Sequence, residues 1–167
     1  MVLVSLSLLR AEPAFDCPRS PVLPISAQFF NHGRSLIVAY LDSQELVAWN
    51  VDPWNQIWSH KIRTRIGATA YHEETRTFLI WNLTDGIDVY RLSDKPTARL
   101  HHVHHLRVTI RCNRICQVQF SLDGLVAITG SDNGQVMLWD IRSGKLTQSL
   151  RHGKGEFFVG SLSYVYV

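Results

Sequence analysis

Short apolar runs separated by turn signals make up most of the chain, and residues 115–153 show this pattern most clearly. The runs ICQVQF, LVAITGS, QVMLWD and KLTQSL are divided by Leu122-Asp123-Gly124, Asp132-Asn133-Gly134 and Arg142-Ser143-Gly144. Asp-Gly and Asn-Gly pairs permit the positive φ angles of tight hairpins. Four runs joined by short turns predict a four-stranded antiparallel meander. Because both faces of its first three runs are largely apolar, this sheet needs cover on both sides.

The same order of runs and turns recurs upstream, at residues 25–62 and 66–103. An aromatic residue of the first run recurs at Phe29, Tyr71 and Phe120, and one of the third run at Trp49, Tyr90 and Trp139. Four strands that repeat every forty-odd residues are the sequence signature of a propeller blade. We therefore predict an all-β fold, a partial and open β-propeller of about three four-stranded antiparallel blades.

The repeat divides the chain into five parts. These are an N-terminal strand or extension (1–24), blade 1 (25–62), blade 2 (66–103), a connection with blade 3 (104–153), and the start of a fourth blade (154–167). Propellers close with roughly four to eight blades. We therefore expect an incomplete or truncated propeller, or one that closes by association through its open strand edges.

The third unit resembles the WD-repeat β-propeller family, above all through GSDNGQVMLWD, residues 130–140. The resemblance covers residues 25–153 and implies a non-catalytic scaffold that binds other proteins. In this family, blades often carry a buried hydrogen-bond set of Trp, Ser or Thr, Asp and His. Here the set is incomplete, since no His stands at the usual distance before the first strand. The blade-signature residues are Phe29, Trp49, Tyr71, Tyr90, Phe120, Thr129, Asn133 (in place of the Asp), Trp139 and Asp140.

The distribution of charge says more about function than the overall composition does. The 167 residues are 46% hydrophobic and 19% charged, which is typical of a globular chain, and the formal net charge is +3. Basic residues gather without acids on each fourth strand and on the connection after it. We therefore predict a basic face for acidic partner segments, with partner-binding residues Arg63, Arg65, Arg107, Arg111 and Arg114. The alternative is a nucleic-acid or phosphopeptide binding module that uses the same face.

Catalytic motifs are missing from the sequence. There is no G-x-S-x-G elbow, and Gly144-Lys145 and Gly153-Lys154 lack the rest of a phosphate loop. We predict no enzyme activity and no cofactor. Three cysteines suggest a reducing compartment, and the N-terminal MVLVSLSLLR lacks the leading positive charge of a signal peptide, so we expect a cytoplasmic or nuclear protein. Asn82-Leu83-Thr84 is a glycosylation sequon, which matters only in a secreted chain.

The stretch RLHHVHHLRVTIRCNRIC, residues 99–116, offers metal-ligand residue types. The spacing of His102, His105, Cys112 and Cys116 resembles a tetrahedral zinc set. Strand alternation, however, points His102 and His104 to one side and His101 and His105 to the other. Cys116 is expected inside the first strand of blade 3. We therefore predict a polar connection with a buried thiol and no structural metal.

Overall fold

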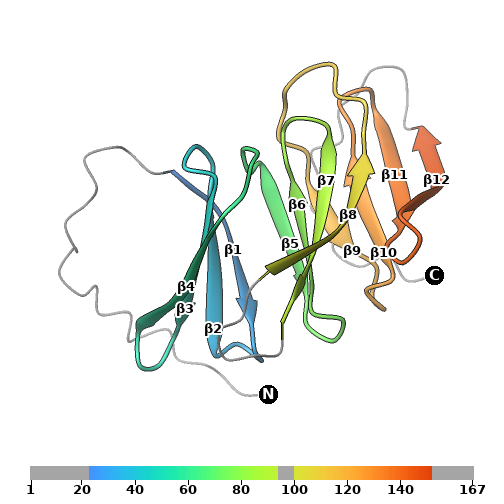
Figure 1. Cartoon of the computed structure of the whole chain (residues 1–167). Coiled ribbons are helices and arrows are strands. Elements are labelled where there is room, and N and C mark those ends of the chain that lie inside the picture. The colour runs from blue at the N-terminus through green and yellow to red at the C-terminus, as the bar shows by residue number, and fades with distance from the viewer. Residues whose placement is uncertain (1–22, 94–99, 152–167) are drawn as a thin grey trace, which may run out of the picture.

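Three antiparallel sheets of four strands each form the molecule in our computed structural model, which describes residues 23–93 and 100–151. The described residues contain twelve strands and no helix. In Figure 1 the sheets stand side by side in chain order, from blue to red. The prediction of an all-β, partial propeller with about three blades is confirmed. The strand expected at the N-terminus and the fourth blade expected at residues 154–167 lie outside the described residues.

Each sheet is a meander whose strands follow the chain. Blade 1 contains β1 (Pro24–Phe30), β2 (Ser35–Tyr40), β3 (Glu45–Asn50) and β4 (Asn55–Lys61). Blade 2 contains β5 (Ala68–His72), β6 (Thr77–Trp81), β7 (Gly86–Leu92) and β8 (Leu100–Arg107). Blade 3 contains β9 (Val118–Phe120), β10 (Val126–Gly130), β11 (Gln135–Asp140) and β12 (Lys145–Arg151). The three turn glycines of blade 3 named above all have positive φ, between 68° and 77°, as the hairpin reading requires.

The aromatic residues found in the repeat occupy one register position in all three sheets. In each blade, one residue of the second strand pairs with the first-strand aromatic on one side and with the third-strand aromatic on the other. The rows are Phe29–Leu36–Trp49, Tyr71–Phe78–Tyr90 and Phe120–Ala127–Trp139. The rows of blades 2 and 3 face the preceding blade. No blade precedes blade 1 among the described residues, and Phe29 is 62% exposed.

Two hydrophobic cores lie between the blades. One joins the Ile37 and Leu46 side of blade 1 to Phe78 and Tyr90 of blade 2. The other joins Leu79, Trp81 and Leu106 of blade 2 to Val118 and Trp139 of blade 3. Blade 2 is therefore covered on both faces, and the first strands β1, β5 and β9 lie next to one another along the inner side of the arc.

Two strand boundaries differ from the sequence-based expectation. β8 continues to Arg107, so His104, His105 and Arg107 lie on the strand and not in the connection after it. β9 begins only at Val118, so Cys116 lies before the first strand of blade 3 and not inside it. Hairpin pairing with β7 extends β8, because Gly86 and Ile87 pair with Arg107 and Leu106.

Candidate functional site

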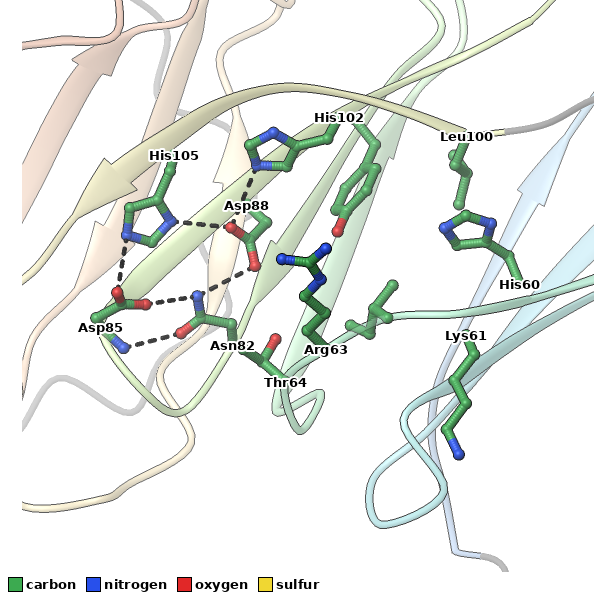
Figure 2. A pocket seen from close by; sticks show the side chains of 12 residues that line it. His60, Lys61, Arg63, Thr64, Asn82, Asp85, Asp88, Leu100, His102 and His105 are labelled. Atoms are coloured by element: carbon green, nitrogen blue, oxygen red, sulfur yellow. Dashed lines mark hydrogen bonds and ion pairs between the residues drawn. The ribbon is translucent and has the colours of Figure 1, made fainter.

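A polar pocket of about 540 Å³ lies where the end of blade 1 meets the outer half of blade 2 (Figure 2). Its walls come from the end of β4, the connection between β4 and β5, the turn between β6 and β7, and strands β7 and β8. The lining residues are His60, Lys61, Ile62, Arg63, Thr64, Asn82, Asp85, Asp88, Tyr90, Leu100, His102 and His105. A volume of this size is within the usual range for ligand pockets, roughly 300–1,000 Å³.

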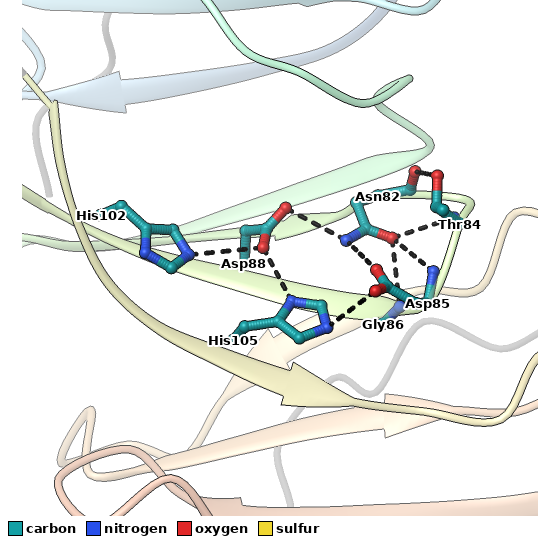
Figure 3. A network of polar contacts seen from close by, with 7 residues as sticks. All are labelled: Asn82, Thr84, Asp85, Gly86, Asp88, His102 and His105. Atoms are coloured by element: carbon teal, nitrogen blue, oxygen red, sulfur yellow. Dashed lines mark hydrogen bonds and ion pairs between the residues drawn. The ribbon is translucent and has the colours of Figure 1, made fainter.

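Asn82 organises the acidic end of the pocket (Figure 3). Its Oδ1 accepts hydrogen bonds from the backbone N–H groups of Thr84, Asp85 and Gly86 at 2.9–3.1 Å. Its Nδ2 donates to Oδ1 of Asp85 at 2.9 Å and to Oδ2 of Asp88 at 3.1 Å. Asn82 is only 1% exposed, so its amide is fully used inside the fold and is not accessible to a glycan.

Asp88 and His105 form the centre of this network. Nδ1 of His105 donates to Oδ1 of Asp88 at 2.9 Å, because a carboxylate can only accept. Nε2 of the same ring is buried and lies 3.3 Å from Oδ2 of Asp85, without hydrogen-bond geometry. Nε2 of His102 lies 3.5 Å from Oδ1 of Asp88. Both carboxylates of the pocket are therefore engaged by neighbouring side chains.

Tyr90 forms an aromatic wall with two imidazoles. The ring of His60, from blade 1, meets Tyr90 edge-on at 6.3 Å between centroids, and that of His102 meets it edge-on at 5.2 Å. Burial, and secondarily the charge of Asp88, raises the pKa of Tyr90 to about 12, although the nearby Arg63 acts in the opposite direction. The phenol therefore keeps its proton at neutral pH and remains a hydrogen-bond donor.

The opposite end of the pocket is cationic. Arg63 and Lys61 are both exposed, and Figure 2 shows Arg63 between the Asp85–Asp88 network and His60. Among the described residues, none of the ion pairs of 4.0 Å or less includes the guanidinium of Arg63 or the amine of Lys61. The pocket thus combines two hydrogen-bonded carboxylates at one end with two exposed cations at the other.

The histidine pattern expected from simple strand alternation is wrong. His102 and His105 share one face of β8, since both reach Asp88. The reason is an irregularity in pairing: Val89 pairs with His104 and Tyr90 with His102, which leaves Val103 as an extra residue. A bulge of this kind shifts the alternation by one position. The sequence does not mark it, because no Gly or Pro occurs there.

Cys112 and Cys116 do not join these histidines. Cys116 packs against the core between blades 2 and 3, and burial together with Asp132 raises the pKa of its thiol to about 11. Cys112 is exposed in the connection after β8. In residues 23–93 and 100–151, no three His, Cys, Asp or Glu side chains converge as metal ligands would. The absence of a structural metal stays a prediction.

Arginines expected on the basic face fall on two connections and one strand. Arg63 and Arg65 lie between β4 and β5, and Arg111 and Arg114 lie between β8 and β9, whereas Arg107 is the last residue of β8. Both connections lie at the upper end of the arc in Figure 1.

Acidic residues of the hairpin turns meet these connections. Asp42, in the turn between β2 and β3, forms an ion pair of 2.8 Å with Arg65. Asp132, in the turn between β10 and β11, accepts hydrogen bonds from the backbone N–H groups of Arg111 and Cys112. The end of the arc therefore mixes both charges, and the acid-free runs of the sequence do not show this because the acids come from other strands.

The hydrogen-bond set implied by the family resemblance is not assembled in blade 3. Thr129 donates to the carbonyls of Gln117 and Gly130, and not to a partner of Trp139. Nε1 of Trp139 is buried without a hydrogen-bond partner among the described residues. Asn133 contacts Ser131 within the turn. Sequence reasoning missed the polar network that does form, which belongs to blade 2 and contains Asn82, Asp85, Asp88 and His105.

The described residues include no helix with the length and apolar character to cross a bilayer. No family model matches the sequence, and no curated protein sequence matches it.

Solved structures resemble the fold. One is described as the crystal structure of a mitotic checkpoint complex, with a TM-score of 0.62 and 14% identity over 77% of this chain and 37% of that chain. Another is the Cps50 (Swd1) beta-propeller domain of Myceliophteria thermophila, with a TM-score of 0.60 and 13% identity over 78% of this chain and 42% of that chain. The chain thus spans well under half of either protein. Its three meander sheets have the fold of a β-propeller arc.

Proposed function

We propose that this chain is a non-catalytic WD-repeat-type interaction module that binds an acidic segment of a partner protein through its basic face. The observation that carries the proposal is the arginine content of the connections after β4 and β8. Arg63, Arg65, Arg111 and Arg114 all belong to them. The guanidinium group suits this role, because it binds a carboxylate or phosphate through two parallel hydrogen bonds.

The description of one similar structure as a complex is consistent with a protein-binding role. Asp42 already pairs with Arg65, so the test leaves Arg65 unchanged. It replaces Arg63, Arg111 and Arg114 together.

The test begins with affinity capture and mass-spectrometric identification of a partner, followed by binding measurements with the purified pair. Replacing Arg63, Arg111 and Arg114 together by Glu should weaken binding by about tenfold or more, since charge reversal at an interface is costly. The matched control combines Arg142→Glu, in the turn between β11 and β12, with Lys145→Glu, at the first residue of β12, and should leave affinity unchanged. Equal affinity of the triple variant and the native chain would refute the proposal.

Nucleic acid is the alternative ligand of this face. It would be favoured if the chain bound duplex or single-stranded nucleic acid with an affinity that falls steeply with salt, as phosphate contacts require. A weak affinity that is insensitive to the triple replacement would exclude this alternative.

Self-association is a further partner proposal, and β12 supports it. Among the described residues β12 is an edge strand of its sheet, and every residue of it is exposed, including Leu146 at 46% and Leu150 at 47%. Exposed edge strands with apolar residues pair readily with other strands. Light scattering should therefore show a mass that rises with protein concentration, and replacing Leu146 and Leu150 by Lys should lower it. A constant monomer mass at all concentrations would contradict this expectation.

A further inference from the structure

The pocket between blades 1 and 2 differs in chemistry from the rest of the arc's end. Three of its four carboxylate oxygens accept a hydrogen bond within the fold: Oδ1 of Asp85 and Oδ2 of Asp88 from Asn82, and Oδ1 of Asp88 from His105. The donors that a ligand can use are the guanidinium of Arg63 and the protonated hydroxyl of Tyr90. A guanidinium that forms none of the ion pairs of the described residues favours an anionic group at its end of the pocket.

The walls of the pocket hold the ring of Tyr90 in place. Tyr90 is only 9% exposed, and its ring is contacted edge-on by His60 and His102. His102 is in turn held near Asp88. Arg63 follows the buried Ile62, which anchors the chain where it leaves β4. A donor that is held in place, such as the hydroxyl of Tyr90, reduces the entropic cost of binding.

We propose that this pocket binds an anionic group, a carboxylate or a phosphate, carried by a short peptide segment of a partner. A volume of about 540 Å³ exceeds what a single anion fills, which favours a side chain together with its neighbouring residues. The proposal deepens the proposed function and rests on it for the nature of the partner. It assigns Arg63 and Tyr90 as the residues that contact the anion.

The test uses inorganic phosphate and acetate as separate probes on the full chain labelled with ¹⁵N, at constant ionic strength set with sodium chloride. Saturable shifts of the amide signals of Arg63, Thr64 and His102 are expected with at least one probe, and the better probe identifies the group. Arg63→Gln should weaken that binding by about tenfold, the worth of one charge-assisted hydrogen bond. Tyr90→Phe should weaken it by about threefold to tenfold, because it removes a neutral donor.

Arg142→Gln is the matched control, as an exposed arginine that does not line the pocket, and should bind the probe like the native chain. Arg63 is itself exposed, so Arg63→Gln tests the proposal even if Tyr90→Phe disturbs the core. Shifts that grow linearly without saturation, or equal binding by Arg63→Gln, would overturn the proposal. Replacement of Arg111 and Arg114, which lie outside the pocket, affects only the proposed function. The two ideas can therefore fail separately.

Discussion

Blades 2 and 3 have the same topology but are buried to different depths. Every residue of β6 is buried, and so are most residues of β7, whereas β10 and β11 alternate and β12 is exposed throughout. Yet blade 3 has the sequence closest to a WD-type repeat, and blade 2 the weaker one. The difference shows that a blade's burial depends on having neighbours on both faces, and that a good match to the repeat does not ensure a complete hydrogen-bond set.

The two buried tryptophans give the largest test of this comparison. Trp139→Ala should lower the free energy of unfolding by about 3–5 kcal/mol, the usual cost of removing a large core side chain. Trp81→Ala should reach about 5 kcal/mol, because Trp81 is 1% exposed and its Nε1 also donates to the carbonyl of Arg114 at 3.1 Å. Urea unfolding of both variants measures the difference. A larger loss of unfolding free energy for Trp139→Ala would contradict the expectation that the more deeply buried tryptophan stabilises the fold more.

Two glycines with positive φ, Gly86 at the start of β7 and Gly144 in the turn before β12, test the same comparison at the backbone. A Cβ at Gly86, where φ is +144°, would lie 2.1 Å from the carbonyl oxygen of Leu106. Gly86→Ala should therefore cost about 3 kcal/mol or more, since β7 and β8 would have to separate. At Gly144, where φ is +68°, the nearest atom would be 3.6 Å away, so Gly144→Ala should cost only the left-handed strain of about 1 kcal/mol. Thermal unfolding compares the two, and equal losses would contradict the close approach at Gly86.

The smallest effect comes from the indole nitrogens alone. Trp81→Phe removes a hydrogen bond and leaves a carbonyl without its donor, whereas Trp139→Phe removes a donor that has no partner among the described residues. Both replacements remove a similar ring volume, so the difference between them reports the hydrogen bond. Trp81→Phe should lower the free energy of unfolding by about 1–2 kcal/mol more than Trp139→Phe. Denaturant midpoints of the two variants provide the measurement. An equal cost would mean that Nε1 of Trp139 is satisfied by water.

Much of the fold follows from local patterns in the sequence. Turn glycines and evenly spaced aromatics such as Tyr71 and Tyr90 predict the strands and their register, because hairpin geometry depends on neighbouring residues. The polar network was not predictable, since it depends on the unsignalled bulge at Val103, which brings His102 and His105 to one face. The pairing of Asp42 with Arg65 was also hidden, because it joins a hairpin turn to the connection that leaves the same blade.

The shared register of the aromatic rows gives the stack of blades a polarity. In blades 2 and 3 the row faces backwards along the chain, toward Ile37 and Leu46 in one case and toward Leu79 and Val89 in the other. Both interfaces are therefore heterologous: the face of one sheet that carries the aromatic row packs against the opposite face of the preceding sheet. A further sheet that docked at either end with this geometry would add head to tail. Two sheets that met face to face about a two-fold axis would not reproduce the contact seen between the blades.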